Sequence, residues 1–159
     1  MKINIKSNKG VTITGLVIYV SSFLMICLVI GVITTFFFNN TKFLSSEATA
    51  SAEYDILNAY LAKDAKKDGV SIEIDSNGNW IRFSNGNQYI YIPGNDYGQI
   101  YLCNTQNTPN KYFIVANYIN KKDKNEGNKI FSQGANNDSF IINIEILNKL
   151  YTQTYNLKK

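Results

Sequence analysis

Hydrophobic residues are concentrated in one long block near the start of the chain, from Val11 to Phe38, with few polar interruptions. No charged residue occurs from Val11 to Asn40. As a helix this block would measure about 42 Å at about 1.5 Å per residue, whereas the hydrocarbon core of a bilayer is about 30 Å thick. The pattern therefore predicts a transmembrane helix over residues 11–38.

A removable secretory signal peptide is the alternative interpretation of the same block. The apolar cores of such peptides have about 7–15 residues, and their cleavage site follows directly. Here the small-residue motif Ala48-Thr49-Ala50 lies ten residues beyond Phe38, too far for the usual cleavage. The pattern favours a helix that is retained in the membrane.

A helical pattern continues beyond the apolar block. Apolar residues recur at spacings of three to five positions, mostly four, with charged and polar residues between them. This spacing is typical of an amphipathic helix, and Gly69 follows it as a residue suited to a left-handed helix cap. We predict one helix over residues 12–68, and residues 39–69 form its amphipathic continuation together with the cap glycine. Its apolar stripe comprises Leu44, Ala48, Ala52, Ile56, Leu57, Tyr60, Leu61 and Ala65.

From residue 70 the pattern changes to short alternating segments separated by turn residues. Asn77-Gly78 and Asn85-Gly86 lie between such segments, and Asn-Gly is typical of tight hairpins in which both residues adopt positive φ. The polar segment 121–138 is interpreted as a loop with room for one short strand. The predicted strands cover residues 70–75, 80–84, 88–92, 99–103, 112–119, 139–147 and 150–157.

An antiparallel sheet of this kind needs a cover on one face, and the amphipathic half of the helix is the evident candidate. The predicted fold class is therefore α+β, with a long N-terminal helix packed on an antiparallel β domain over residues 70–159. Within that helix we expect Ile56, Leu57, Tyr60 and Leu61 to pack on the sheet.

The charged residues of the chain indicate its orientation in the membrane and say little about its binding partners. The first ten residues form a basic leader with Lys2, Lys6 and Lys9 and no acid. Positive residues favour the cytoplasmic side, so the N-terminus is expected inside the cell and the β domain outside. The net charge is +4, and it nearly vanishes without the three leader lysines, so nothing indicates a nucleic-acid partner.

Candidate chemistry is sparse. The chain has no histidine, and its two cysteines, Cys27 and Cys103, lie in the apolar block and the β domain. The segment that begins at Asp75 resembles a calcium loop only briefly, because Trp80 and Gly86 stand where glycine and glutamate are required. We therefore expect no catalytic residue, no metal site and no cofactor, and we interpret the protein as something other than an enzyme.

The junction Lys9-Gly10-Val11, followed by an uncharged helix that continues as an amphipathic one, resembles the class III signal of type IV prepilins and pseudopilins. In that family a membrane peptidase cuts after the glycine on the cytoplasmic side, and the new first residue is usually methylated. The resemblance implies that Gly10 ends the leader and that Val11 begins the mature protein. It extends over residues 9–68, while the β domain carries no specific motif of the family.

The sequence departs from the family at two positions. The family usually has phenylalanine first and glutamate fifth in the mature chain, where this chain has Val11 and Gly15. The glutamate neutralises the N-terminal ammonium of a neighbouring subunit inside the apolar filament core, where an unpaired charge is costly. Members without it include minor subunits at the filament tip. The resemblance therefore implies a minor pilin or pseudopilin, of the competence type among others, at or near the tip.

Function, partners and location follow from the same resemblance. It implies a structural subunit of a type IV pilus, a type II secretion system or a DNA-uptake (competence) filament. The implied partners are a prepilin peptidase, other pilin or pseudopilin subunits, a membrane platform protein and membrane lipid. The protein would cross the cytoplasmic membrane once and reach the cell surface in the filament. The alternative is a bitopic protein whose external β domain binds a ligand or a cell-wall component.

Overall fold

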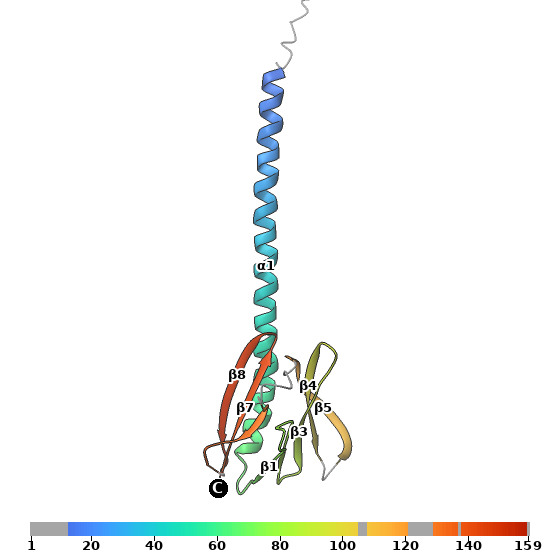
Figure 1. Ribbon diagram of the computed structural model, residues 1–159, viewed down its shortest axis with the longest axis vertical. Coiled ribbons are helices and arrows are strands. Elements are labelled where there is room, and N and C mark those ends of the chain that lie inside the picture. Colours follow the sequence, from blue (N-terminus) through green and yellow to red (C-terminus); the bar gives the residue numbers. More distant parts are fainter. Residues whose placement is uncertain (1–12, 105–107, 121–128, 137, 159) are drawn as a thin grey trace, which may run out of the picture. The chain divides into compact units, whose positions relative to one another are not determined.

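The structure, a computed structural model, describes residues 13–104, 108–120, 129–136 and 138–158 (Figure 1). The chain divides into two compact units, residues 1–44 and 45–159, and helix α1 contributes to both. The elements are α1 (Ile13–Ala65), β1 (Ile72–Ile74), β2 (Trp80–Phe83), β3 (Asn87–Ile92), β4 (Tyr97–Asn104), β5 (Thr108–Asn120), β6 (Phe131–Gln133), β7 (Ser139–Ile146) and β8 (Lys149–Asn156).

The described part of the first unit is the apolar half of α1. Side chains are exposed on every side of this helix, including Leu16, Phe23, Leu28 and Phe37, each more than half exposed. The first charged residue of α1 is Lys42. A helix that is apolar all round is stable in apolar surroundings such as the interior of a bilayer.

The second unit contains the remaining turns of α1 and one antiparallel sheet. The strand order is β1-β2-β3-β4-β5-β7-β6, and β8 pairs with the other edge of β7. β5 and β7 are joined by a single residue pair, Ile119 with Ile146, and the Phe131 N–H donates to the Gly78 carbonyl at 3.0 Å. The sheet therefore curls until β6 meets the β1–β2 turn. In Figure 1 the last turns of α1 lie between the β7–β8 hairpin and β3–β5. The predicted α+β fold is confirmed.

The core lies between α1 and the concave side of the sheet. Leu57 and Leu61 of α1 are fully buried. Around them, Phe83 contacts Tyr89 and Phe140 edge-on, with ring centroids 5.8 and 5.6 Å apart. Because these rings come from β2, β3 and β7, they join strands that lie far apart in the sheet order. The other buried core residues are Ala50, Ala65, Val70, Ile81, Tyr91, Ile100, Val115, Ala116, Ile119, Ile130, Phe131, Ile142, Ile144, Ile146 and Tyr155.

The hairpin turns differ from the prediction in their conformation. Only the glycines of the two Asn-Gly pairs have positive φ, 68° at Gly78 and 88° at Gly86. The N–H of each glycine donates to the carbonyl three residues earlier, so each turn ends on a left-handed glycine. The expectation that both residues of each pair adopt positive φ was wrong. The turn with two left-handed residues is instead Leu147-Asn148, between β7 and β8.

The C-terminal end of α1 is closed by a distant part of the chain. The Lys158 N–H donates to the carbonyl of Ala65, the last helical residue, at 3.1 Å. Gly69 has a φ of 65°, the left-handed conformation that the sequence predicts, but its N–H donates to the Lys158 carbonyl. The backbone that follows β8 therefore supplies the partner that a helix end requires.

Candidate functional site

Helix α1 has two apolar faces in the second unit, and only one of them packs on the sheet. Ala50, Leu57 and Leu61 are fully buried on the sheet side. On the outer side, Ile56 and Tyr60 remain 49% and 43% exposed, and three alanines beside them are also exposed. We call the apolar residues of this outer face the apolar ridge; it comprises Ala48, Ala52, Ile56, Ala59 and Tyr60, and the charged residues Asp55 and Lys63 are exposed on the same side.

The ridge corrects the prediction for two of the four packing residues. Leu57 and Leu61 are fully buried in the core, whereas Ile56 and Tyr60 are nearly half exposed on the outer side. The reason is geometric: consecutive residues of an α-helix point about 100° apart, because one turn takes about 3.6 residues. Ile56 and Leu57 therefore cannot both face the centre of one sheet, and the burial of Leu57 directs Ile56 outward.

Polar contacts on both sides of α1 fix its rotation. Toward β5, the Glu53 carboxylate accepts the backbone N–H of Asn117 at 2.8 Å. Toward β8, the Tyr155 hydroxyl donates to Asn58 Oδ1 at 2.6 Å, and the rings of Tyr54 and Tyr151 stack with centroids 4.3 Å apart. Because these contacts join α1 to strands on both of its sides, they fix its rotation with the apolar ridge facing outward.

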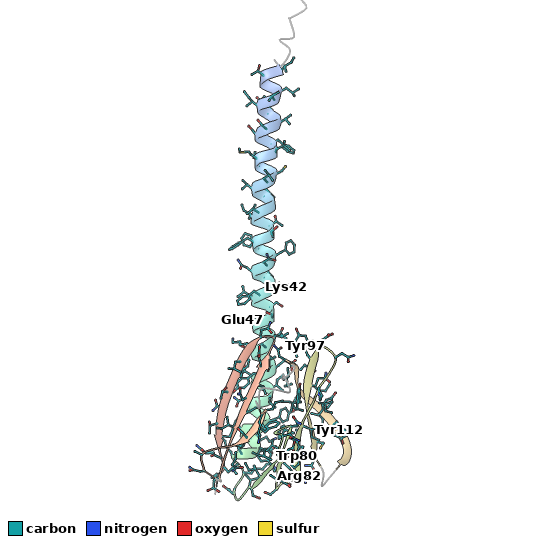
Figure 2. All side chains as sticks on the ribbon, viewed as in Figure 1. Lys42, Glu47, Trp80, Arg82, Tyr97 and Tyr112 are labelled. Carbon is teal, nitrogen blue, oxygen red and sulfur yellow. The ribbon has the colours of Figure 1, made fainter. Side chains whose placement is uncertain are left out.

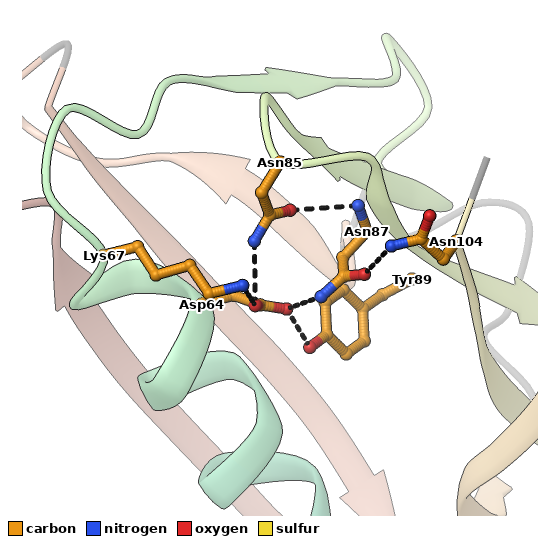
Figure 3. Close-up of polar contacts among 6 residues, drawn as sticks. All are labelled: Asp64, Lys67, Asn85, Asn87, Tyr89 and Asn104. Atoms are coloured by element: carbon orange, nitrogen blue, oxygen red, sulfur yellow. Dashed lines mark hydrogen bonds and ion pairs between the residues drawn. The ribbon is translucent and has the colours of Figure 1, made fainter. Parts of the chain in front are cut away.

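A buried carboxylate joins the last turn of α1 to the β2–β3 hairpin (Figure 3). Asp64 is 2% exposed and accepts hydrogen bonds from the Asn85 amide at 2.9 Å, from the Asn87 amide at 2.7 Å and from the Tyr89 hydroxyl at 2.7 Å. The Lys67 ammonium lies 3.1 Å away. Both carboxylate oxygens are thus satisfied, as a buried charge requires. We call this set of residues the Asp64 cluster.

The electrostatics of the Asp64 cluster favour the ionised carboxylate. Burial alone would raise the pKa of Asp64, but the hydrogen bonds from Tyr89, Asn87, Lys67 and Asn85 outweigh it, and the pKa is lowered. Burial, together with the bond to Asp64, raises the pKa of the Tyr89 hydroxyl, which therefore remains a donor. The arrangement binds helix to sheet and leaves the carboxylate no free lone pair for proton transfer to a substrate.

Sequence reasoning missed the Asp64 cluster. A signal was present, because Asp64 follows Leu57 and Leu61 at helical spacing and so belongs to the buried stripe. An acid within such a stripe indicates a buried partner. The Asn85-Gly86-Asn87 hairpin is rich in amide donors, but its contact with Asp64 spans more than 20 residues of sequence.

The other candidate residues are placed as follows. Gly15 lies in the first turns of α1, whose first turn has no acidic residue. Gly10 and Val11 lie outside the described residues. Across the described part of the chain, no group of three or more histidine, cysteine, aspartate or glutamate residues is arranged to hold a metal ion. Cys27 is exposed on the apolar half of α1, and Cys103 is buried in β4, where burial raises the pKa of its thiol.

The fold and the site define a general class of protein. The described residues include one helix long and apolar enough to cross a membrane, and it lies near the N-terminus. Such a helix followed by a β domain fits a single-pass, bitopic membrane-anchored protein, and it is compatible with a pilin-like architecture. Comparison of the chain with protein-family models, with curated proteins and with solved structures found no match.

Proposed function

We propose that this protein is a minor pilin or pseudopilin-like structural subunit of a type IV pilus, a type II secretion system or a DNA-uptake filament. The observation that carries the proposal is the apolar ridge of α1. A helix that served only as a membrane anchor would need apolar residues in its membrane half alone. Beyond the membrane its outer face would be expected to be charged and solvated.

The chemistry of the ridge suits the packing of one helix against another. Ala48, Ala52 and Ala59 are small, so a second helix can approach closely, and Ile56 and Tyr60 add apolar area. The sheet already covers the opposite face of α1, so the ridge remains available to helices of other subunits. We propose that a prepilin peptidase, a membrane platform protein and membrane lipid are the remaining partners.

The place of the subunit follows from the start of α1. Gly15 offers no carboxylate, and no acidic residue precedes Glu47. If Val11 carried the mature N-terminal ammonium into an apolar helical bundle, repeated copies of this chain would leave that charge unpaired at a cost of several kcal/mol each. We therefore propose a scarce subunit at or near the filament tip.

The second candidate function is a bitopic anchor whose external domain binds a ligand. A polar hollow at one end of the sheet, lined by Asn95, Asp96 and Tyr97 among others, favours it. The two functions differ in what they require of α1: the filament subunit uses the ridge, whereas the anchored binding protein does not.

A charge on the ridge tests the filament proposal. In Ala52→Glu, filament assembly would bury an unpaired carboxylate, so we expect the amount of subunit in sheared filaments to fall at least tenfold, which corresponds to about 1.4 kcal/mol or more. Because Ala52 is exposed, the unfolding temperature should stay unchanged. Quantitative mass spectrometry of filaments measures the first quantity, and thermal unfolding of the purified protein the second.

The matched control is Gln153→Glu, which adds the same carboxylate on an exposed position of β8. It should enter filaments like the wild type. Normal incorporation of the Ala52→Glu variant would exclude the ridge as the assembly surface.

Processing gives an independent test. The mature protein extracted from membranes should begin at Val11, and Gly10→Val should leave the precursor uncut, because a Cβ and its branches would obstruct the peptidase at the cleaved bond. N-terminal sequencing and the electrophoretic mobility of both forms measure this. A mature protein that begins near Ser51 would instead indicate ordinary signal cleavage and would end the pilin interpretation.

A further inference from the structure

A polar hollow lies at the end of the sheet where the β3–β4 turn, the end of β5 and the β7–β8 turn meet. A cavity of about 560 Å³ is lined there by Asn95, Asp96, Tyr97, Asn120 and Asn148. A second cavity of about 320 Å³ shares the first three of these residues and extends toward Asn117 and Tyr118. We call the two together the Tyr97 hollow. Figure 2 shows Tyr97 at the end of the sheet near Glu47, away from Trp80 and Arg82.

The backbone around the Tyr97 hollow is strained. Among the described residues, those other than glycine with positive φ are Tyr118, Leu147 and Asn148, at 57°, 48° and 68°. The three belong together, since the Leu147 N–H donates to the Tyr118 carbonyl at 3.2 Å. This conformation is uncommon for bulky side chains such as those of Tyr118 and Leu147. The β7–β8 hairpin turn accounts for this conformation at Leu147 and Asn148, so Tyr118 is the residue whose positive φ the turn does not explain.

Two aromatic side chains form one wall. The rings of Tyr97 and Tyr118 meet edge to face, with centroids 5.9 Å apart and planes at 79°. They are 41% and 44% exposed, so apolar ring surface remains open to the hollow. An aromatic ring of this kind gives a flat apolar surface beside a polar hydroxyl, which suits a ligand with both apolar and polar faces.

The polar walls are rigid at the base and open at the rim. At the base, the Asn120 amide donates to Glu145 at 2.9 Å and to Asn148 at 2.7 Å. At the rim, the side chains of Asn95 and Asp96 form no hydrogen bond or ion pair with any described residue. The hollow therefore combines a fixed framework with polar groups that are available to a ligand, the usual design of a small-molecule site.

The kind of polar group available selects the ligand. Amides and tyrosine hydroxyls both donate and accept hydrogen bonds, and the Asp96 carboxylate accepts them. A divalent cation is usually held by several carboxylates together with carbonyl oxygens, and Asp96 is the one carboxylate among the described lining residues; an anion would meet Asp96 with no cation lining the described walls. A hydroxyl group both donates and accepts, so it matches the amide-rich rim. We propose that the Tyr97 hollow binds a neutral carbohydrate, with C–H groups of a sugar ring on Tyr97 and hydroxyls at Asn95 and Asp96.

The test uses the full-length protein in lipid nanodiscs without sugar detergents, titrated calorimetrically with three probes. These are the tetramers of β-1,4-linked N-acetylglucosamine, β-1,4-linked glucose and α-1,4-linked glucose. Binding of the first alone would identify a cell-wall type of glycan, and binding of either glucose tetramer would identify another polysaccharide. Saturable binding of at least one probe is expected. No binding at 10 mM of any probe, or binding of Ca²⁺ in its place, overturns the proposal.

Substitutions in the Tyr97 hollow test whether the sugar binds there. Tyr97→Ala and Asp96→Ala should each weaken binding at least tenfold, because the first removes the stacking surface and the second a hydroxyl acceptor. The matched control is Tyr112→Ala, which removes an exposed tyrosine of β5 that does not line the hollow, and its affinity should remain within twofold of the wild type. Undiminished binding in both hollow variants would place the sugar elsewhere. Since no filament is needed, this result is independent of the ridge experiment.

Discussion

Replacing Leu57 by aspartate should destabilise the second unit by about 4 kcal/mol or more, a large part of the stability of a domain of this size. Leu57 is fully buried between α1 and the sheet. The substitution removes its apolar contacts and places a carboxylate where no donor is available, and a change of this kind belongs to the most destabilising class. Domains of this size are stable by only about 5–15 kcal/mol. Denaturant unfolding followed by circular dichroism measures the loss.

The adjacent residue offers a matched control. Ile56→Asp introduces the same side chain one position earlier, on the exposed ridge, where water solvates the charge. Its effect on stability should be below about 1 kcal/mol. The same variant should nevertheless fail to enter filaments, for the reason given for Ala52. Equal destabilisation by the two substitutions would show that α1 is rotated differently on the sheet.

Removal of the Asp64 carboxylate should have the second-largest effect on stability. In Asp64→Ala the part-buried amide of Asn87 and the buried hydroxyl of Tyr89 lose their acceptor, and each buried donor left unsatisfied typically costs about 1–3 kcal/mol. The control is Lys67→Ala: Lys67 is half-exposed, so the loss should be below about 1 kcal/mol. A small effect of Asp64→Ala would show that the Asp64 cluster does not hold the helix to the sheet.

The pH dependence of the free energy of unfolding gives a second test of the role of Asp64. The pKa of Asp64 is lower in the folded protein than its ordinary value of 3.8. The ionised carboxylate therefore contributes stability above the ordinary pKa, and this contribution is lost as the pH falls through the lowered folded value. The wild type should lose stability below about pH 4, whereas Asp64→Ala should lack this part of the acid dependence. Urea unfolding at neutral and acid pH compares the two proteins.

The fold was largely predictable because its signals are periodic and local. A helical repeat over many turns and alternating strands between glycine-containing turns lead directly to the α+β architecture. The helical repeat does not determine which of two neighbouring rows of apolar residues faces the sheet. For this reason the sequence predicts the same packing role for Ile56 and for Leu57. The short strand β6 was harder to locate, since its pairing with β7 depends on contacts outside its own segment.

The candidate sites were less predictable than the fold. The Asp64 cluster and the Tyr97 hollow are both assembled from segments that are separate in sequence and carry no motif. Asn95, Tyr118 and Asn148 approach one another only because the start of β4, the end of β5 and the end of β7 lie at the same end of the sheet. Each of these residues is typical of an ordinary turn or strand, and only the fold brings them together around one hollow.

The contact of α1 with β8 has a consequence for the order of folding. Ser51 lies beside Tyr151 and Asn58 accepts from Tyr155, contacts that span 100 and 97 residues of sequence. The ribosome makes the helix first and its partner strand last, so this half of α1 emerges without the surface it will cover. Such non-local contacts slow folding, and the apolar residues of α1 that they cover stay exposed in the interval. This half of α1 is therefore fixed in place only after β8 has been made.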